Sequence, residues 1–146
     1  MKCPLGHGEL RAESHAGIAV EVCPSCGGEW LDHDDLQSLE KLVVNDPVVL
    51  SGMIEYQRHE SERACPVCSK TMYGFDYRAN PLEIDACPQG HGYWLDGGEE
   101  AEVKDLILRR ARDLNRAASA ESSFGSFLSG IRGQFGGRGR GNGRRY

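Results

Sequence analysis

The chain has 146 residues, of which 39% are hydrophobic and 27% are charged, and its formal net charge is −5. No run approaches the roughly 18 apolar residues that a membrane-spanning helix needs, and no charged segment followed by an apolar one opens the chain. We therefore expect a soluble, cytoplasmic protein. Its six cysteines are too sparse for a disulfide scaffold, so cross-linking is the weaker explanation for them.

Charge is divided unevenly along the chain. Residues 1–105 hold 8 Lys or Arg against 20 Asp or Glu, a net charge of −12, whereas residues 106–146 hold 9 Arg against 2 acids, a net charge of +7. The acidic part is a poor candidate for binding phosphate groups, and the basic part attracts polyanions.

The dipeptide Cys-Pro occurs four times, and each time a second possible zinc ligand follows closely. Cys3 and His7 have the spacing C-x-x-x-H, and Cys23 and Cys26 have the spacing C-x-x-C. A structural zinc ion takes four thiolate or imidazole ligands, which usually arrive as two close pairs separated by a longer loop. These four residues therefore predict a first zinc site.

The segments that follow Cys3 and His7 have the hydrophobic periodicities and end signals of strands and helices. Residues 18–22 alternate apolar and polar side chains, which predicts a strand of an antiparallel hairpin. Asp32 and Asp35 have the spacing of an N-cap and an N3 carboxylate, so we expect a helix to begin at Asp32. Asn45-Asp46-Pro47 ends this helix and predicts another, which runs to about His59 and links the two halves.

The second half repeats the first, because residues 65–100 align with residues 3–36. Apolar and polar side chains alternate over residues 72–86 on both sides of a turn at Ala79-Asn80-Pro81, which predicts a second hairpin.

Each half supplies three Cys and one His, so we expect two Zn²⁺ ions per chain. Since each ligand set lies in one half, we expect loss of one metal to leave the other bound. The ligands of the second set are Cys65, Cys68, Cys87 and His91.

Three further groups of residues bear on the candidate sites. Trp30 and Trp94 each follow a pair of ligands, and we expect them to pack over the metal sites. His15, His33 and His59 lack a paired ligand and are interpreted as solvated or locally hydrogen-bonded histidines. The basic tail supplies candidate nucleic-acid-binding residues, which are Arg132, Arg138, Arg140, Arg144 and Arg145.

These patterns predict a small, metal-stabilised α+β fold. Two tandem zinc ribbons, each made of short antiparallel hairpins and metal-binding turns, are each followed by a helix. A Gly- and Arg-rich tail that cannot bury a core is expected to be disordered. The expected parts are ribbon 1 with its helix over residues 1–44, a helical linker over 45–64, ribbon 2 with its helix over 65–120, and the tail over 121–146.

The run Cys23-Pro-Ser-Cys26-Gly-Gly-Glu-Trp30-Leu31-Asp32 resembles the signature of the transcription factor IIB-type zinc-ribbon family, C-P-x-C-G-G-x-W-L-D-x-G-E-L. The first copy departs from it after Asp32, with His33, Asp34 and Asp35 where Gly and Glu are usual. The second copy departs at Gly90-His91, where the family has the second Cys, and keeps Trp94-Leu95-Asp96. The resemblance covers about half of the chain and implies small zinc ribbons with a link to transcription.

Three functions are compatible with these observations. The first is a non-enzymatic adaptor whose zinc ribbons form a scaffold while the Arg/Gly tail contacts single-stranded nucleic acid or an acidic partner. The tail could instead serve solubility or fold back on the acidic part.

The second function is a protein–protein interaction or dimerisation module without nucleic-acid binding, which would use the helices after Trp30-Leu31-Asp32 and Trp94-Leu95-Asp96. The third is an enzyme. We expect no catalytic residue, because four protein ligands close each site and each C-x-x-C has a partner pair.

Overall fold

The computed structural model describes residues 1–116. The five tail arginines named above lie outside these described residues. Residues 1–110 form one unit, and the description of the chain beyond it is limited to a helical stretch that ends at residue 116. Among the described residues, no helix is long and apolar enough to cross a membrane.

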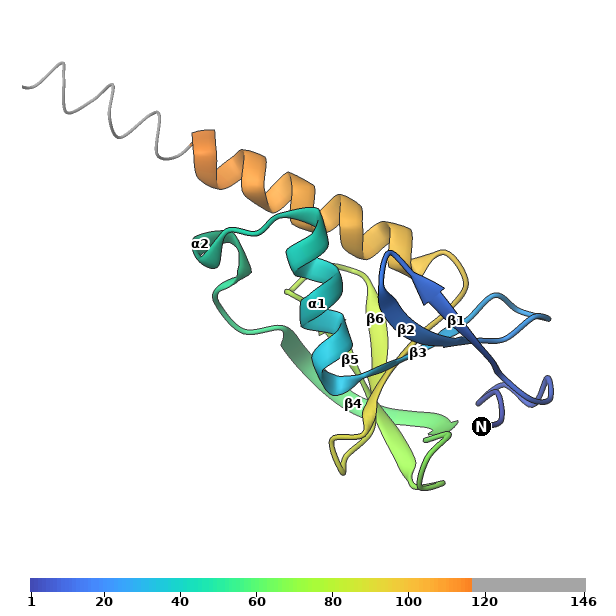
Figure 1. Cartoon of the computed structure of the whole chain (residues 1–146). Coiled ribbons are helices and arrows are strands. Elements are labelled where there is room, and N and C mark those ends of the chain that lie inside the picture. Colours follow the sequence, from blue (N-terminus) through green and yellow to red (C-terminus); the bar gives the residue numbers. More distant parts are fainter. Residues whose placement is uncertain (117–146) are drawn as a thin grey trace, which may run out of the picture. The chain divides into compact units, whose positions relative to one another are not determined.

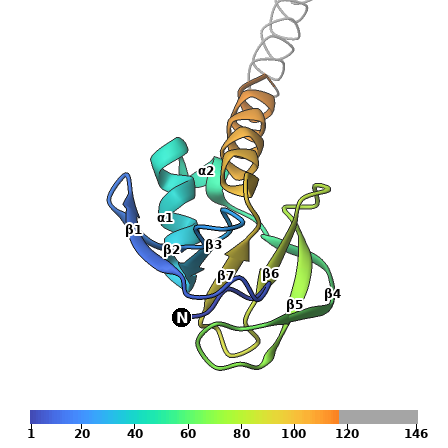
Figure 2. The same cartoon turned by 90° about the vertical axis from the view of Figure 1, so that its right-hand side faces the viewer.

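Seven strands form one antiparallel sheet in the order β1-β2-β3-β7-β6-β5-β4. Figure 1 shows the sheet with α1 beside it, and Figure 2 shows β7 between β3 and β6. The sheet places the two halves of the sequence side by side, because β3 of the first half pairs with β7 of the second. The strands of the first half are β1 (Arg11–His15), β2 (Ile18–Val22) and β3 (Glu29–Asp32). Those that follow are β4 (Glu55–Ala64), β5 (Thr71–Tyr77), β6 (Glu83–Ala86) and β7 (Gly92–Leu95).

Both predicted hairpins are confirmed. In β2, Ile18 and Val20 are buried and Ala19 is exposed, which is the alternation that a sheet with one covered face requires. β5 and β6 join through a turn in which Arg78 and Ala79 adopt positive φ angles of 49° and 59°. β1, β2 and β3 thus correspond to β5, β6 and β7, whereas β4 has no counterpart in the first half.

The predicted helical linker over residues 45–64 is wrong. A helix forms only at α2 (Pro47–Leu50), where the Asp46 side chain accepts a hydrogen bond from the backbone N–H of Val48 at 2.9 Å. Residues 55–64 form β4, which pairs with β5 at the edge of the sheet. The side chains of β4 are mostly exposed, so a helix there would have had no apolar face to pack. Backbone pairing with the free edge of β5 decides the structure instead.

The α1 helix (His33–Val43) packs against β2, β3 and β7. Asp32 occupies its N-cap position, but the Asp32 side chain makes no capping hydrogen bond, which corrects the predicted cap. A further helix begins at residue 99, after β7. Across the turn that precedes it, the backbone N–H of Asp96 donates to the Glu99 carboxylate at 2.6 Å.

A buried ionic network ties α1 to the second half of the chain. The Glu40 carboxylate accepts hydrogen bonds from the Tyr77 hydroxyl and, at 3.0 Å, from Nε of Arg78. The Arg78 guanidinium also donates to the backbone carbonyl oxygens of Ser51 at 2.9 Å and Leu50 at 3.0 Å. One arginine therefore holds the helix, the β5–β6 turn and the segment after α2 together.

Glu40→Gln should destabilise the protein by about 3 kcal/mol or more, because it leaves the Arg78 charge buried without its partner. The Glu40 side chain is only 2% exposed, so water cannot replace the lost carboxylate. Urea unfolding of the metal-loaded protein measures the effect. Glu83→Gln is the matched control, since Glu83 is 59% exposed and pairs with His59 at the surface. Equal effects of the two changes would contradict a stabilising role for the network.

Candidate metal centres

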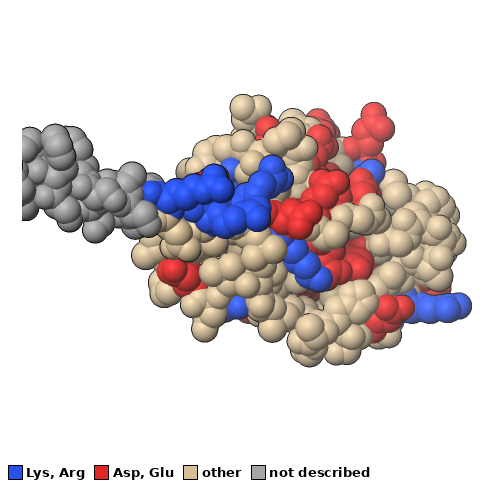
Figure 3. All heavy atoms as spheres, turned by 90° about the horizontal axis from the view of Figure 1, so that it is seen from above, with Lys and Arg blue, Asp and Glu red and all other residues tan. Residues whose placement is uncertain are grey.

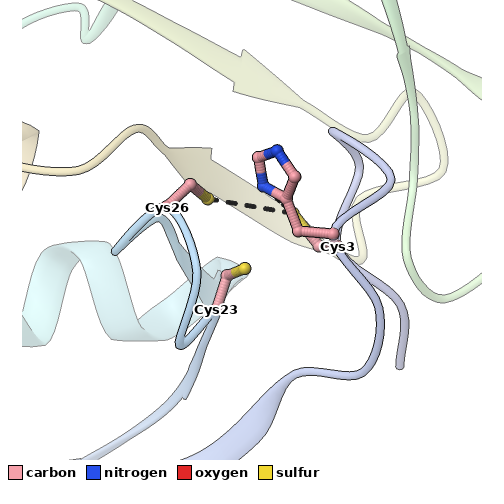
Figure 4. A group of neighbouring side chains, drawn as sticks. Cys3, Cys23 and Cys26 are labelled. Atoms are coloured by element: carbon pink, nitrogen blue, oxygen red, sulfur yellow. Dashed lines mark hydrogen bonds between the residues drawn. The ribbon is translucent and has the colours of Figure 1, made fainter.

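The first ligand set lies where two turns approach each other. Cys3 and His7 precede β1, and Cys23 and Cys26 lie in the turn between β2 and β3 (Figure 4). The four ligand atoms all lie within 4.8 Å of one another. Sγ of Cys3 is 3.9 Å from Sγ of Cys26 and 3.8 Å from Nδ1 of His7.

The second set repeats this arrangement. Cys65 and Cys68 lie in the turn between β4 and β5, and Cys87 and His91 lie between β6 and β7. Its ligand atoms again lie within 4.8 Å of one another. Sγ of Cys87 is 3.6 Å from Sγ of Cys68 and 3.4 Å from Nδ1 of His91. The structure therefore brings together all eight ligands expected from the sequence, each set from one half.

These distances fit a tetrahedral zinc ion. Bonds of about 2.3 Å to sulfur and about 2.0 Å to nitrogen place two sulfur ligands about 3.8 Å apart and a sulfur and a nitrogen about 3.5 Å apart. The observed separations are 3.6 and 3.9 Å between sulfurs and 3.4 and 3.8 Å between sulfur and nitrogen. All six cysteines are free thiols, so the disulfide alternative is wrong.

Backbone N–H groups prepare one cysteine of each set to bind a cation. Burial opposes ionisation of Cys23, but the N–H groups of the next residues in its turn lower its pKa to about 6. The same balance at Cys87 lowers its pKa to about 7. Burial raises the pKa of Cys26 and Cys65 to about 11. Because thiolates are the ligand form, the lowered pKa of one thiol in each set favours metal binding near neutral pH.

The two sets share one buried core. Trp30 of β3 lies directly opposite Trp94 of β7, and both side chains are buried. Each indole packs against the other half of the chain. The Trp94 ring covers Gly28, and the Trp30 ring lies next to Gly92. Each Trp was expected to pack at the metal sites, and the core cluster does include cysteines of both sets. That cluster consists of Cys3, Leu10, Cys23, Trp30, Cys65, Met72, Cys87 and Trp94.

Comparison with known families finds a match within the first half of the chain. Residues 2–41 match the model of a family described as transcription factor zinc-finger, the zinc ribbon of transcription factor IIB. This segment is therefore similar to the transcription factor IIB-type zinc ribbons, as its motif indicates. The second half has the same types of ligand and the same strand order, with the His in its second ligand pair instead of its first, but it lies outside the matched residues. Comparisons with curated proteins and with solved structures gave no match.

The remaining histidines differ from one another. The His33 side chain is 56% exposed, and His59 forms a hydrogen bond with Glu83 at 2.9 Å, so these two histidines are solvated and hydrogen-bonded as expected. His15 lies instead beside Glu29 and Glu100, in a third group of possible metal ligands. The sequence analysis missed this group, because 85 residues separate His15 from Glu100 and no short spacing marks the three as a set.

Proposed function

We propose that this protein is a non-enzymatic adaptor in which two structural zinc ions fix a two-ribbon unit and the basic C-terminal segment contacts single-stranded nucleic acid. The observation that carries the proposal is the pair of closed four-ligand sets. A catalytic zinc ion normally keeps one position for water, whereas each set here offers four protein ligands to a tetrahedral ion. The first ribbon's family adds a link to transcription.

The charge distribution supports a structural role for the ribbons and a nucleic-acid-binding role for the C-terminal segment. The two ribbons are acidic, and acidic residues also begin the helix that follows β7, at Glu99, Glu100 and Glu102. Basic residues follow in the same helix, and Figure 3 shows Lys and Arg side chains gathered where the described residues end. Phosphate groups are therefore attracted to the C-terminal part of the chain and repelled by the ribbons.

Replacing the five tail arginines, Arg132, Arg138, Arg140, Arg144 and Arg145, with Gln tests the nucleic-acid role. We expect the full-length protein to bind single-stranded RNA or DNA with an affinity that falls steeply with salt, since about five neutralised phosphates give a log–log slope of about −3.5. The variant should lose this binding and keep both zinc ions. Fluorescence anisotropy at several salt concentrations and metal analysis measure the two quantities.

The outcomes separate the proposals. If the variant binds as well as the unchanged protein, residues before the tail contact the nucleic acid and the role proposed for the five tail arginines is wrong. If neither protein binds at low salt, the alternative function as a protein–protein interaction module replaces the nucleic-acid-binding adaptor.

The helix residues expected to serve such a module, including Leu36, Leu39 and Ile107, are buried in the fold. Exposed apolar side chains such as Leu42 on α1 and Leu108 on the helix after β7 are available to a partner instead.

A further inference from the structure

Three side chains outside both cysteine sets converge on one point. His15 ends β1, Glu29 begins β3, and Glu100 lies in the first turn of the helix after β7. Nδ1 of His15 is 3.5 Å from Oε1 of Glu29 and 3.4 Å from Oε2 of Glu100. One possible ligand atom from each residue lies within 4.8 Å of the other two.

The second nitrogen of His15 fixes the orientation of the ring. Nε2 lies 3.0 Å from Oε2 of Glu13, a hydrogen-bond distance at which the N–H donates to the carboxylate. In the neutral imidazole the other nitrogen, Nδ1, then has a lone pair that faces two carboxylates. Metal-binding histidines are commonly held in this way, with one nitrogen on the ion and the other donating to a carboxylate.

The distances within the group favour an ion over direct hydrogen bonds. A good N–H···O bond is about 2.9 Å long, whereas two ligands about 2.1 Å from a tetrahedral ion lie about 3.4 Å apart. The observed 3.4 and 3.5 Å match the second arrangement. Only 12% of the Glu29 side chain is exposed, and within the described part of the chain its Oε2 is a buried oxygen with no hydrogen-bond donor.

The net negative charge of the group can be balanced by a divalent cation. Glu13, Glu29 and Glu100 contribute three negative charges, and Lys104 returns one by pairing with Oε1 of Glu100 at 2.8 Å. With His15 neutral and all three carboxylates ionised, which is the form that binds a metal, the group has a net charge of −2, which one divalent ion balances. Burial and a hydrogen bond with Glu100 raise the pKa of Glu29 to about 7, and the hydrogen bond to Glu13 raises the pKa of His15. Without a cation, protons on these two groups therefore offset part of the negative charge.

We propose that His15, Glu29 and Glu100 bind a third divalent metal ion, of the transition-metal class that accepts nitrogen and oxygen ligands. Unlike the two cysteine sets, this site has no sulfur, and it supplies only three protein atoms. At least one coordination position therefore remains for water or another ligand. The ion would bridge the β1–β2 hairpin, β3 and the helix after β7, and it would exchange more readily than zinc held by thiolates.

Titration of the zinc-loaded, full-length protein with Mn²⁺ tests the site. Mn²⁺ is the weakest binder of the first-row divalent series and prefers oxygen ligands, so it leaves zinc on the thiolates. We expect one Mn²⁺ per chain, counted from the loss of the free-ion electron paramagnetic resonance signal. Glu29→Gln and His15→Asn should each weaken binding at least about ten-fold. Glu83→Gln is the matched control and should bind Mn²⁺ as the unchanged protein does.

Two results would overturn the proposal. The first is the absence of Mn²⁺ binding at millimolar concentration, and the second is binding that neither substitution weakens. In the first case a proton takes the place of the ion, and ¹⁵N chemical shifts should show both nitrogens of His15 protonated. Two zinc ions per chain in each variant show that the fold is intact. Glu100→Gln replaces any variant that loses zinc.

Discussion

Gly28→Ala should destabilise the protein by about 3 kcal/mol or more, the upper part of the range for overpacked cores. A Cβ atom at residue 28 would lie 2.2 Å from Cζ2 and 2.7 Å from Cη2 of Trp94. Carbon atoms in contact are normally about 3.5 to 4.0 Å apart, so the indole would have to move. It is fully buried, and its Nε1–H donates to Asp96 at 3.0 Å, so the surrounding structure resists that movement.

Gly6→Ala is the matched control for this substitution. Gly6 has a φ of +81° but no atom within 4 Å of an added Cβ, so Ala there costs only backbone strain, about 1 to 2 kcal/mol. Urea unfolding of the metal-loaded proteins gives both values. A smaller loss at Gly28 than at Gly6 would show that Trp94 does not lie fixed over the first ribbon in solution.

His91→Ala should weaken metal binding at both cysteine sets. The sequence places each ligand set in one half and so predicts that the first metal stays bound. The structure revises this expectation, because β3 pairs with β7 and Trp94, from the second half, covers Gly28 beside the first set. A structural zinc ion contributes on the order of 10 kcal/mol to folding, so its loss disorders the strand that carries Trp94.

Competition with a chromophoric chelator measures the zinc affinity of each set. We expect the affinity of the first set to fall about ten-fold or more in His91→Ala, a coupling free energy of about 1.4 kcal/mol or more. His59→Ala, at an exposed histidine that no metal set includes, should retain two zinc ions of unchanged affinity. Zinc held at the first set of His91→Ala with the original affinity would show that the ribbons fold independently.

The sequence was sufficient for the ligand sets and the hairpins because both depend on local spacing. C-x-x-C and C-x-x-x-H pairs place two donors in one turn, and a period of two marks a strand with one buried face. β4 could not be predicted in this way. Its residues are polar on both faces, and it becomes a strand only because β5 offers a free edge. The group around His15 has the same difficulty, since tertiary structure alone brings Glu100 to it.

The two Trp-Leu-Asp motifs show that identical local sequence can have different surroundings. In the second half, the Asp96 carboxylate accepts hydrogen bonds from Nε1 of Trp94 at 3.0 Å and from Arg63 at 2.8 Å. In the first half, Asp32 is exposed, and Nε1 of Trp30 has no acceptor among the described residues. Arg63 belongs to β4, the strand that the first half lacks, so the sequence motif itself does not contain the difference.

The register of β3 against β7 has the symmetry of an isologous dimer interface. Trp30 pairs with Trp94, its own equivalent, while Glu29 pairs with Leu95 and Leu31 with Tyr93, so that equivalent positions exchange partners about a local two-fold axis. A polypeptide with a single ribbon of this type would leave the same strand edge unpaired, and a second copy could complete it in the same register. Fusion of two such copies makes the association intramolecular and independent of protein concentration. It also frees each half to acquire features of its own, such as β4 in one and the His15 group in the other.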